Sequence, residues 1–250
     1  MSNGENLYTH AAMVASSRAM IVVAPNWHPI RTSVEYAHST AVGRFVSRKS
    51  RRAFNWDGFA ERHLMRISEA DCRFVRYLAQ PHRLEIMVDD SDRPLLYFPD
   101  LRRDLEDGTI EIIEVKKTKE EIESDPDYAF KIAKAESVYS ALGWKFRIMV
   151  AEEEIDVNPV YSNAKMICED NFSLIGRREH LAIAEAFQVN DALPYGRAIE
   201  IIAAAAGVTL VGAKAVLHAL ICTREAGINI KKKITRDSAV TKPGKARGRH

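Results

Sequence analysis

Residues 109–117, TIEIIEVKK, alternate in the manner of a β-strand but carry an acid and a base on the same side. On a strand, side chains two residues apart share a face, so Glu114 and Lys116 point the same way as Ile112. Charge is costly inside a sheet unless it is paired or used. The stretch therefore predicts a strand that carries either a structural salt bridge or an active site.

The segments around this strand predict a mixed α/β fold. Strands are expected over residues 73–79, 83–89, 94–100, 109–117 and 144–151, with a hairpin-type turn at Asp107-Gly108. Helices are expected over residues 57–71, with Asp57 as N-cap, and over residues 125–143, with Asp125 as N-cap, Pro126 in the first turn and Gly143 at the end. The order helix, strands, helix, strand favours a mixed α/β layer over a repeated βαβ unit.

A change of composition marks a second, mainly helical region. The acidic, proline-containing stretch over residues 152–160 is typical of a linker. Beyond it, Gly207 is expected to end one helix, Thr209 to cap the next and Gly227 to end that one. Residues 228–234, INIKKKI, predict a short strand. Helix, tight turn, helix and strand are the layout of a winged helix.

The 250-residue chain is long enough for one large domain or two smaller ones. The expected parts are an N-terminal arm (1–42), an α/β domain (43–151), a helical winged-helix-like domain (161–230) and a basic tail (231–250). The tail holds eight Lys or Arg against one Asp, whereas the net charge of the chain is only +2. Two interpretations remain open, a polyanion-binding segment and a solvated, disordered end.

Composition and cysteine usage indicate a cytoplasmic protein. The chain is 46% hydrophobic and 28% charged, which is ordinary for a globular domain. Its three cysteines are widely spaced and form no CxxC motif, so neither a disulfide framework nor a zinc site is expected. The apolar patch over residues 11–25 contains Arg18, is too short to span a bilayer and lacks a preceding basic region. We therefore expect neither a signal peptide nor a membrane partner.

Asp100, Glu114 and Lys116 form a recognisable chemical set. Pro-Asp, thirteen intervening residues and then Glu-x-Lys make up the PD-(D/E)xK nuclease pattern. Two carboxylates at the ends of neighbouring strands can share Mg²⁺ or Mn²⁺, which activates water and stabilises charge on a phosphate oxygen. A neighbouring lysine can orient the water or neutralise the transition state. The alternative is a surface ion pair between Glu114 and Lys116 on an edge strand.

Several further motifs extend this pattern over residues 43–150. They are the basic-aromatic segment GRFVSRKSRRAFNW (43–56), the helix opening FAER with Glu61, Gln80-Pro81, Tyr97-x-Pro99-Asp100 and Glu114-Val115-Lys116. The order and spacing of these motifs resemble those of the catalytic domain of TnsA-type transposon endonucleases, which are the partners of DDE-type transposases. The second region is compatible with the helical, winged-helix-like domain of that family by layout.

The resemblance implies a restriction-endonuclease-like mixed sheet flanked by helices. It makes Glu61, Asp100 and Glu114 the metal-binding acids and Lys116 the catalytic lysine. The implied activity is Mg²⁺-dependent cleavage of DNA at transposon 5′ ends, while a DDE-type transposase acts on the 3′ ends. Two alternatives stay open, namely a phage or repair nuclease of the same superfamily and a non-cutting DNA-binding assembly factor with the nuclease fold.

Basic residues in two segments are candidates for DNA contacts. They are Arg48, Lys49, Arg51 and Arg52 in the basic-aromatic segment, and Lys231, Lys232 and Lys233 after the second region. In the alternative interpretation the aromatic side chains are core and the charges are solvated. The helix after Thr209 is mostly apolar, with Lys214, His218 and Arg224 as its polar groups, so it is either a packing helix or a base reader.

Overall fold

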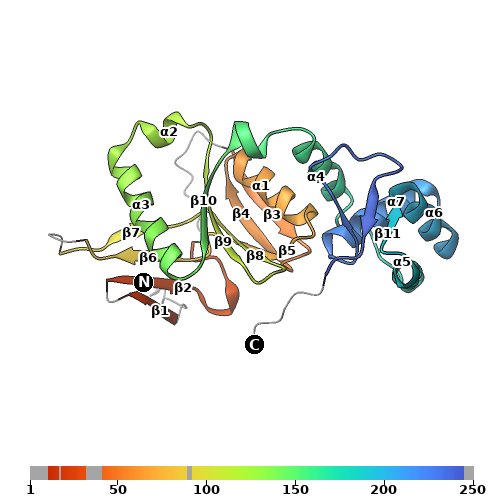
Figure 1. Ribbon diagram of the computed structural model, residues 1–250, viewed down its shortest axis with the longest axis horizontal. Coiled ribbons are helices and arrows are strands. Elements are labelled where there is room, and N and C mark those ends of the chain that lie inside the picture. The colour runs from red at the N-terminus through yellow and green to blue at the C-terminus, as the bar shows by residue number, and fades with distance from the viewer. Residues whose placement is uncertain (1–10, 17, 32–40, 89–91, 245–250) are drawn as a thin grey trace, which may run out of the picture.

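A four-stranded sheet forms the centre of the α/β part in the computed structural model, which describes residues 11–16, 18–31, 41–88 and 92–244 (Figure 1). Its strands are, in spatial order, β10 (Lys145–Val150), β9 (Ile110–Lys116), β8 (Leu101–Leu105) and β5 (Phe74–Ala79). β9 and β10 are parallel, and the other neighbours are antiparallel. The sheet is therefore mixed, as the order of predicted elements indicates.

Helices cover both faces of this sheet. They are α1 (Phe59–Ala70), α2 (Glu120–Glu123) and α3 (Pro126–Ala141). The predicted caps of α3 are confirmed, because the Asp125 side chain accepts a hydrogen bond from the backbone N–H of Tyr128 at 3.0 Å and Pro126 occupies the first turn. Gly108, at φ +86°, makes the tight turn between β8 and β9.

The alternation predicted for residues 109–117 is confirmed by the two hydrophobic cores. Ile113 is fully buried in the cluster that contains Leu64 of α1, whereas Ile112 is fully buried in the cluster that contains Tyr139 of α3. Glu114 and Lys116 therefore lie on the α3 side of β9. Figure 1 shows α3 on one side of the sheet and α1, with the C-terminal helices beyond it, on the other.

A second sheet lies beneath α3 and includes part of the expected N-terminal arm. Its strands are, in spatial order, β1 (Ala11–Ser16), β2 (Ala19–Val23), β6 (Arg83–Ile86) and β7 (Leu95–Tyr97), with a 3-10 turn, η1 (Pro25–Trp27), after β2. β2 pairs with β6, and Ile21 is fully buried against the α3 cluster. The arm is thus not loosely structured over these strands, because its apolar residues complete a core. Residues 1–10 and 32–40 of the arm lie outside the described residues.

The basic-aromatic segment forms a β-hairpin. Its strands are β3 (Val42–Ser47) and β4 (Arg52–Asp57). Phe54 and Trp56 are buried in the α1 cluster, as expected for core aromatics. The charged side chains of the segment have several different environments, which are described with the site.

The second region contains four helices and a small sheet. Its elements are α4 (Val160–Glu169), α5 (Arg177–Val189), β11 (Ala192–Pro194), α6 (Tyr195–Ala206), α7 (Leu210–Cys222), β12 (Gly227–Ile228) and β13 (Ala239–Thr241). The predicted end at Gly207 (φ +68°) is confirmed, and Thr209 Oγ1 accepts from the Gly212 N–H at 3.2 Å. The strand predicted over residues 228–234 is wrong beyond Ile228.

No flexible linker separates the two regions. Residues 151–155 form a π-helical turn, η2 (Ala151–Ile155), and Ile155 is fully buried. One hydrophobic cluster continues from Phe54 and Leu64 through Ile167 to Val240. The expected linker was an inference from acidic composition, but apolar Ile155 lies inside that run.

The expected basic tail is also part of the fold over most of its described length. β13 is the central strand of the small sheet, between β11 and β12, and its Val240 is fully buried. Residues 245–250 lie outside the described part. Within the described part, no single helix is long and apolar enough to cross a membrane. Among the described helices, only the pair α6 and α7 meets that requirement together, and the two helices are bent by 109° at their junction.

Candidate active site

Asp100, Glu114 and Lys116 are brought together at one end of the central sheet. Asp100 immediately precedes β8, and its backbone N–H donates to the carbonyl of Ile113 on β9 at 3.1 Å. Glu114 and Lys116 follow on β9. The strand expected over residues 94–100 is shorter than predicted. β7 ends at Tyr97, and the chain enters the other sheet after Pro99 and Asp100, which places Asp100 between two sheets.

The Asp100 carboxylate lies in a region of concentrated negative charge. Burial raises its pKa well above the ordinary value, and the charges of Glu114 and Glu61 raise it further. A hydrogen bond from the Val115 N–H to Oδ2, at 2.7 Å, and the charge of Lys116 act in the opposite direction. Glu114 and Glu61 are therefore close enough to Asp100 to perturb its ionisation.

Glu114 is 6% exposed and has three partners in the protein. Its Oε2 accepts from the Tyr97 hydroxyl at 2.7 Å, and its Oε1 accepts from the Tyr128 hydroxyl at 2.5 Å. Lys116 Nζ lies 3.1 Å from Oε1 and 4.1 Å from the centre of the Tyr128 ring. The sequence reasoning missed both tyrosines as site residues, although Tyr97 stands three residues before Asp100 and Tyr128 lies in the first turn of α3.

Glu61 reaches the site from the first turn of α1. Its Oε2 accepts from the Asp57 N–H at 3.0 Å. Burial raises the pKa of Glu61 to about 7; this backbone hydrogen bond lowers it, and the charges of Asp57 and Glu114 raise it. The expectation that Asp57 is the N-cap of this helix is wrong, because Gly58 at φ +87° takes that position and Glu61 reaches back over it.

The donor set suits a hard cation, yet it is not arranged as a finished metal site. Among the described residues, no group of three His, Cys, Asp or Glu side chains has the geometry to hold a metal ion. The raised pKa values of Asp100 and Glu61 arise in part from carboxylate repulsion, which a divalent cation offsets. Both oxygens of Glu114 are occupied by tyrosine hydroxyls. These acids fit Mg²⁺ chemically, provided that Glu114 leaves its present partners.

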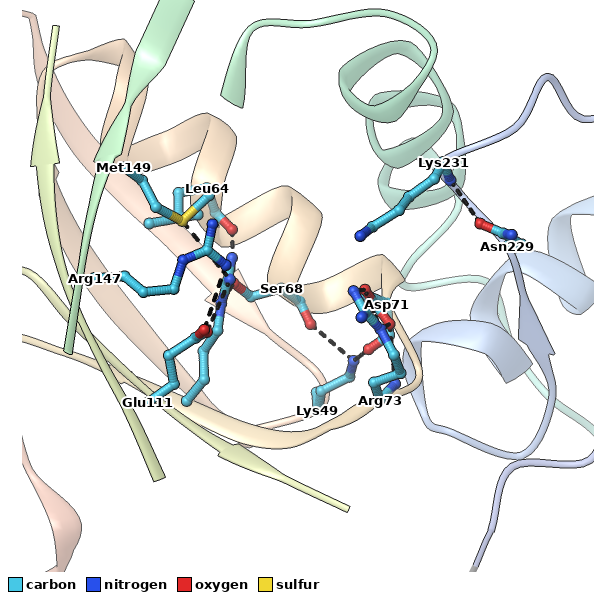
Figure 2. Close-up of polar contacts among 11 residues, drawn as sticks. Lys49, Leu64, Ser68, Asp71, Arg73, Glu111, Arg147, Met149, Asn229 and Lys231 are labelled. Carbon is cyan, nitrogen blue, oxygen red and sulfur yellow. Dashed lines mark hydrogen bonds and ion pairs between the residues drawn. The ribbon is translucent and has the colours of Figure 1, made fainter. Parts of the chain in front are cut away.

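Two of the predicted DNA-contacting residues have structural partners instead. Arg48 Nη1 donates to the carbonyls of Asn171 and Ser173, at 2.8 and 2.9 Å. Lys49 Nζ donates to the carbonyls of Ser68 and Asp71, at 2.8 and 2.7 Å (Figure 2). Both side chains thus tie the hairpin turn to neighbouring segments.

Arg51 and Arg52, which follow, differ from this pair. Arg51 is exposed in the turn, at φ +55°. Arg52 Nη2 donates to the Asn26 carbonyl at 3.1 Å, and the side chain lines a pocket with Arg31 and Arg44. Arg52 is the predicted DNA-contacting residue of this hairpin that faces an open pocket.

Lys231, Lys232 and Lys233 are exposed between β12 and β13. Their backbone is fixed, because Asn163 Nδ2 donates to the Lys232 carbonyl at 2.8 Å and the Lys231 N–H donates to Asn229 Oδ1 at 2.9 Å (Figure 2). The three ammonium groups therefore extend from an ordered loop rather than from a loose tail.

Helix α7 is mainly a packing helix. His218 is fully buried, and its ring nitrogens contact the Tyr195 hydroxyl at 2.6 Å and Asp170 Oδ2 at 2.7 Å. Arg224, beyond the helix, donates to the Cys72 carbonyl at 2.8 Å. Of the polar groups weighed as base readers, only Lys214 remains in a partly exposed position on α7.

A buried acid that the sequence reasoning did not single out holds this part of the structure together. Glu69 is fully buried on α1. Its carboxylate accepts five hydrogen bonds, from the Ser47 and Tyr77 hydroxyls, the backbone N–H groups of Arg48 and Lys49, and Asn171 Nδ2. A single helical glutamate gives no sequence signal for this role, because all its donors are distant along the chain or belong to the backbone.

Comparison of the sequence with models of protein families finds no match, and comparison with curated proteins finds none either.

Proposed function

We propose that this chain is a Mg²⁺-dependent DNA endonuclease of the TnsA type, which cuts DNA at transposon 5′ ends together with a DDE-type transposase. The observation that carries the proposal is the convergence of Glu61, Asp100 and Glu114 with Lys116 at one end of a mixed sheet. A buried acid whose pKa is raised by neighbouring carboxylates, beside a lysine, is typical of a catalytic centre. The transposase partner rests on the sequence resemblance alone.

In this proposal Asp100 and Glu114 hold the cation and Glu61 adds a third carboxylate. When bound, Mg²⁺ lowers the pKa of a coordinated water and stabilises charge on the scissile phosphate. Lys116 orients the attacking water and offsets the negative charge that develops on the phosphate. The Asp100 carboxylate is positioned for this role by the Val115 N–H, which restricts its rotation.

The architecture supports the same proposal. A mixed sheet with helices on both faces suits a restriction-endonuclease-like domain. In the second region, the chain order α5, β11, α6, α7, β12, β13 and the sheet order β11-β13-β12 suit a winged helix, with the lysines of residues 231–233 on its wing.

The test is cleavage of supercoiled plasmid with Mg²⁺ or Mn²⁺, by the full chain alone and with a transposase encoded beside it. We expect cleavage that is lost in Asp100→Ala and in Lys116→Ala, with the fold of each variant checked by its melting temperature. Lys145→Ala, an exposed lysine at the opposite end of β10, is the matched control. Full activity in Asp100→Ala, or no cleavage in any combination, contradicts the proposal.

One observation favours a second candidate, a DNA-binding assembly factor that does not cut. Both carboxylate oxygens of Glu114 are held by tyrosine hydroxyls, an arrangement that satisfies the charge without a metal. Calorimetry with Mn²⁺ separates the two candidates. A nuclease takes up the ion in a manner that requires Asp100 and Glu114, and Tyr128→Phe strengthens uptake because it frees Oε1. No uptake by either the wild type or Tyr128→Phe favours the assembly factor.

A further inference from the structure

A pocket of about 300 Å³ beside the candidate active site is lined by three arginines. Arg44 belongs to β3, Arg52 begins β4, and Arg31 precedes the hairpin in the chain. None of the lining residues that the structure describes is an aspartate or a glutamate. Like charges gathered without a counter-charge repel one another, so this arrangement favours binding of an anion.

The hydrogen-bonding capacity of these arginines is largely unused. Nε and Nη1 of Arg52 are buried and have no hydrogen-bond partner in the protein. A buried donor without a partner is unfavourable, because it loses its hydrogen bonds to water and gains none in the protein. Arg44 is exposed and makes no ion pair within the described ranges. Arg31 lies 4.2 Å from the centre of the Phe98 ring, which leaves its guanidinium edge free to donate.

The pocket is joined to the acidic site through the backbone. Gln80, which also lines the pocket, donates its N–H to the Asp100 carbonyl at 2.8 Å and accepts at its own carbonyl from the Ile30 N–H at 2.9 Å. Gln80 has φ +44°, a conformation that is uncommon for a residue other than glycine and that often accompanies a functional site. One wall of the pocket, formed by Gln80 and the segment that precedes Arg31, is therefore fixed to the backbone of Asp100.

We propose that this arginine pocket binds a backbone phosphodiester of the DNA strand next to the phosphate at Asp100. This rests on the proposed function, because the acidic site is taken to receive the scissile phosphate. Gln80 lines the pocket and is hydrogen-bonded to the Asp100 carbonyl, so the pocket is next to the acidic site along the protein surface. A DNA strand with one phosphate at Asp100 therefore carries its neighbouring phosphates toward the pocket. Planar guanidinium groups suit phosphate because they donate two parallel hydrogen bonds.

The experiment measures binding of a fluorescent DNA duplex by anisotropy in EDTA, so that neither metal uptake nor cleavage is needed. Arg44→Gln and Arg52→Gln are compared with the wild type over a salt titration, and Lys145→Gln, which removes one exposed charge at the far end of β10, is the control. We expect each arginine variant to weaken binding about 3- to 10-fold at low salt and to reduce the salt slope by about one, with the control close to wild type. Melting temperatures show whether half-buried Arg52 is also needed for stability, whereas Arg44 is exposed and tests the pocket directly.

Unchanged affinity and salt slope in both arginine variants overturn the proposal. A second outcome also overturns it. In that outcome all variants bind DNA equally, and inorganic phosphate raises the melting temperature of the wild type but not of the arginine variants. The pocket would then bind a free anion and not DNA. Cleavage assays separate this proposal from the nuclease. Arginine-dependent binding without any cleavage leaves the pocket as a DNA site and contradicts only the endonuclease.

Discussion

Replacing Glu61 by Gln is expected to stabilise the metal-free protein above neutral pH. Burial, followed by the charges of Asp57 and Glu114, raises the pKa of Glu61 from 4.5 to about 7 in the folded chain. Between these two values the folded protein binds a proton that the unfolded chain has lost, so the free energy of unfolding falls as the pH rises. This loss of stability is absent below about pH 4.5 and complete above about pH 7.

The size of the effect follows from the same two pKa values. Each pH unit corresponds to about 1.36 kcal/mol, which gives about 3 kcal/mol at pH 8. A neutral glutamine avoids this cost, and its amide oxygen can still accept from the Asp57 N–H. For a chain of 250 residues, a change of this size shifts the melting temperature by roughly 6–12 °C.

The assay is thermal unfolding followed by circular dichroism at pH 5, 6, 7 and 8 in EDTA. The difference in melting temperature between Glu61→Gln and the wild type should grow from about a quarter of its full value at pH 5 to its full value at pH 8. Glu136→Gln, at an exposed position on α3, should show no such growth. Mg²⁺ should narrow the gap, because a bound cation offsets the repulsion in the wild type. An equal gap at pH 5 and pH 8 would refute the reasoning.

Three further predictions concern stability. Glu69→Ala should lower the free energy of unfolding in urea by about 3–5 kcal/mol, because five donors lose their acceptor. Burial holds the pKa of His82 at about 3, so the wild type should lose stability as the pH falls below 6.5, and His82→Asn should flatten this acid limb of a melting-temperature profile. Deleting residues 231–250 should prevent cooperative unfolding in a thermal melt because it removes β13, the central strand of the small sheet.

Features that depend on neighbouring residues could be predicted from the sequence. The alternation of residues 109–117, the Asp125 cap of α3 and the end of α6 at Gly207 all depend on contacts within a few residues. The same holds for the grouping of Asp100 with Glu114, since the spacing encodes a hairpin that brings their strands side by side.

Features that depend on distant partners could not be predicted. The strand expected over residues 94–100 ends at Tyr97, because Pro99 and Asp100 carry the chain from one sheet to the other. Lys49 was expected to contact DNA, yet its ammonium binds carbonyls at the end of α1. Basic composition cannot separate Lys49 from Arg52, because the difference lies in which segment packs opposite each side chain.

The junction of the two regions restricts how a partner could control the proposed nuclease. The Glu69 carboxylate accepts hydrogen bonds from Asn171 of the second region and from the turn of the β3–β4 hairpin. Arg48, in that turn, donates two more hydrogen bonds to the loop that contains Asn171. A hinge motion between the regions would break these contacts as well as the continuous core. By contrast, among the described residues only two hydrogen bonds, from Tyr97 and Tyr128, hold the Glu114 carboxylate in its present position. If a transposase activates the enzyme, movement of α3 that withdraws Tyr128 from Glu114 therefore requires less disruption than any rearrangement of the two regions.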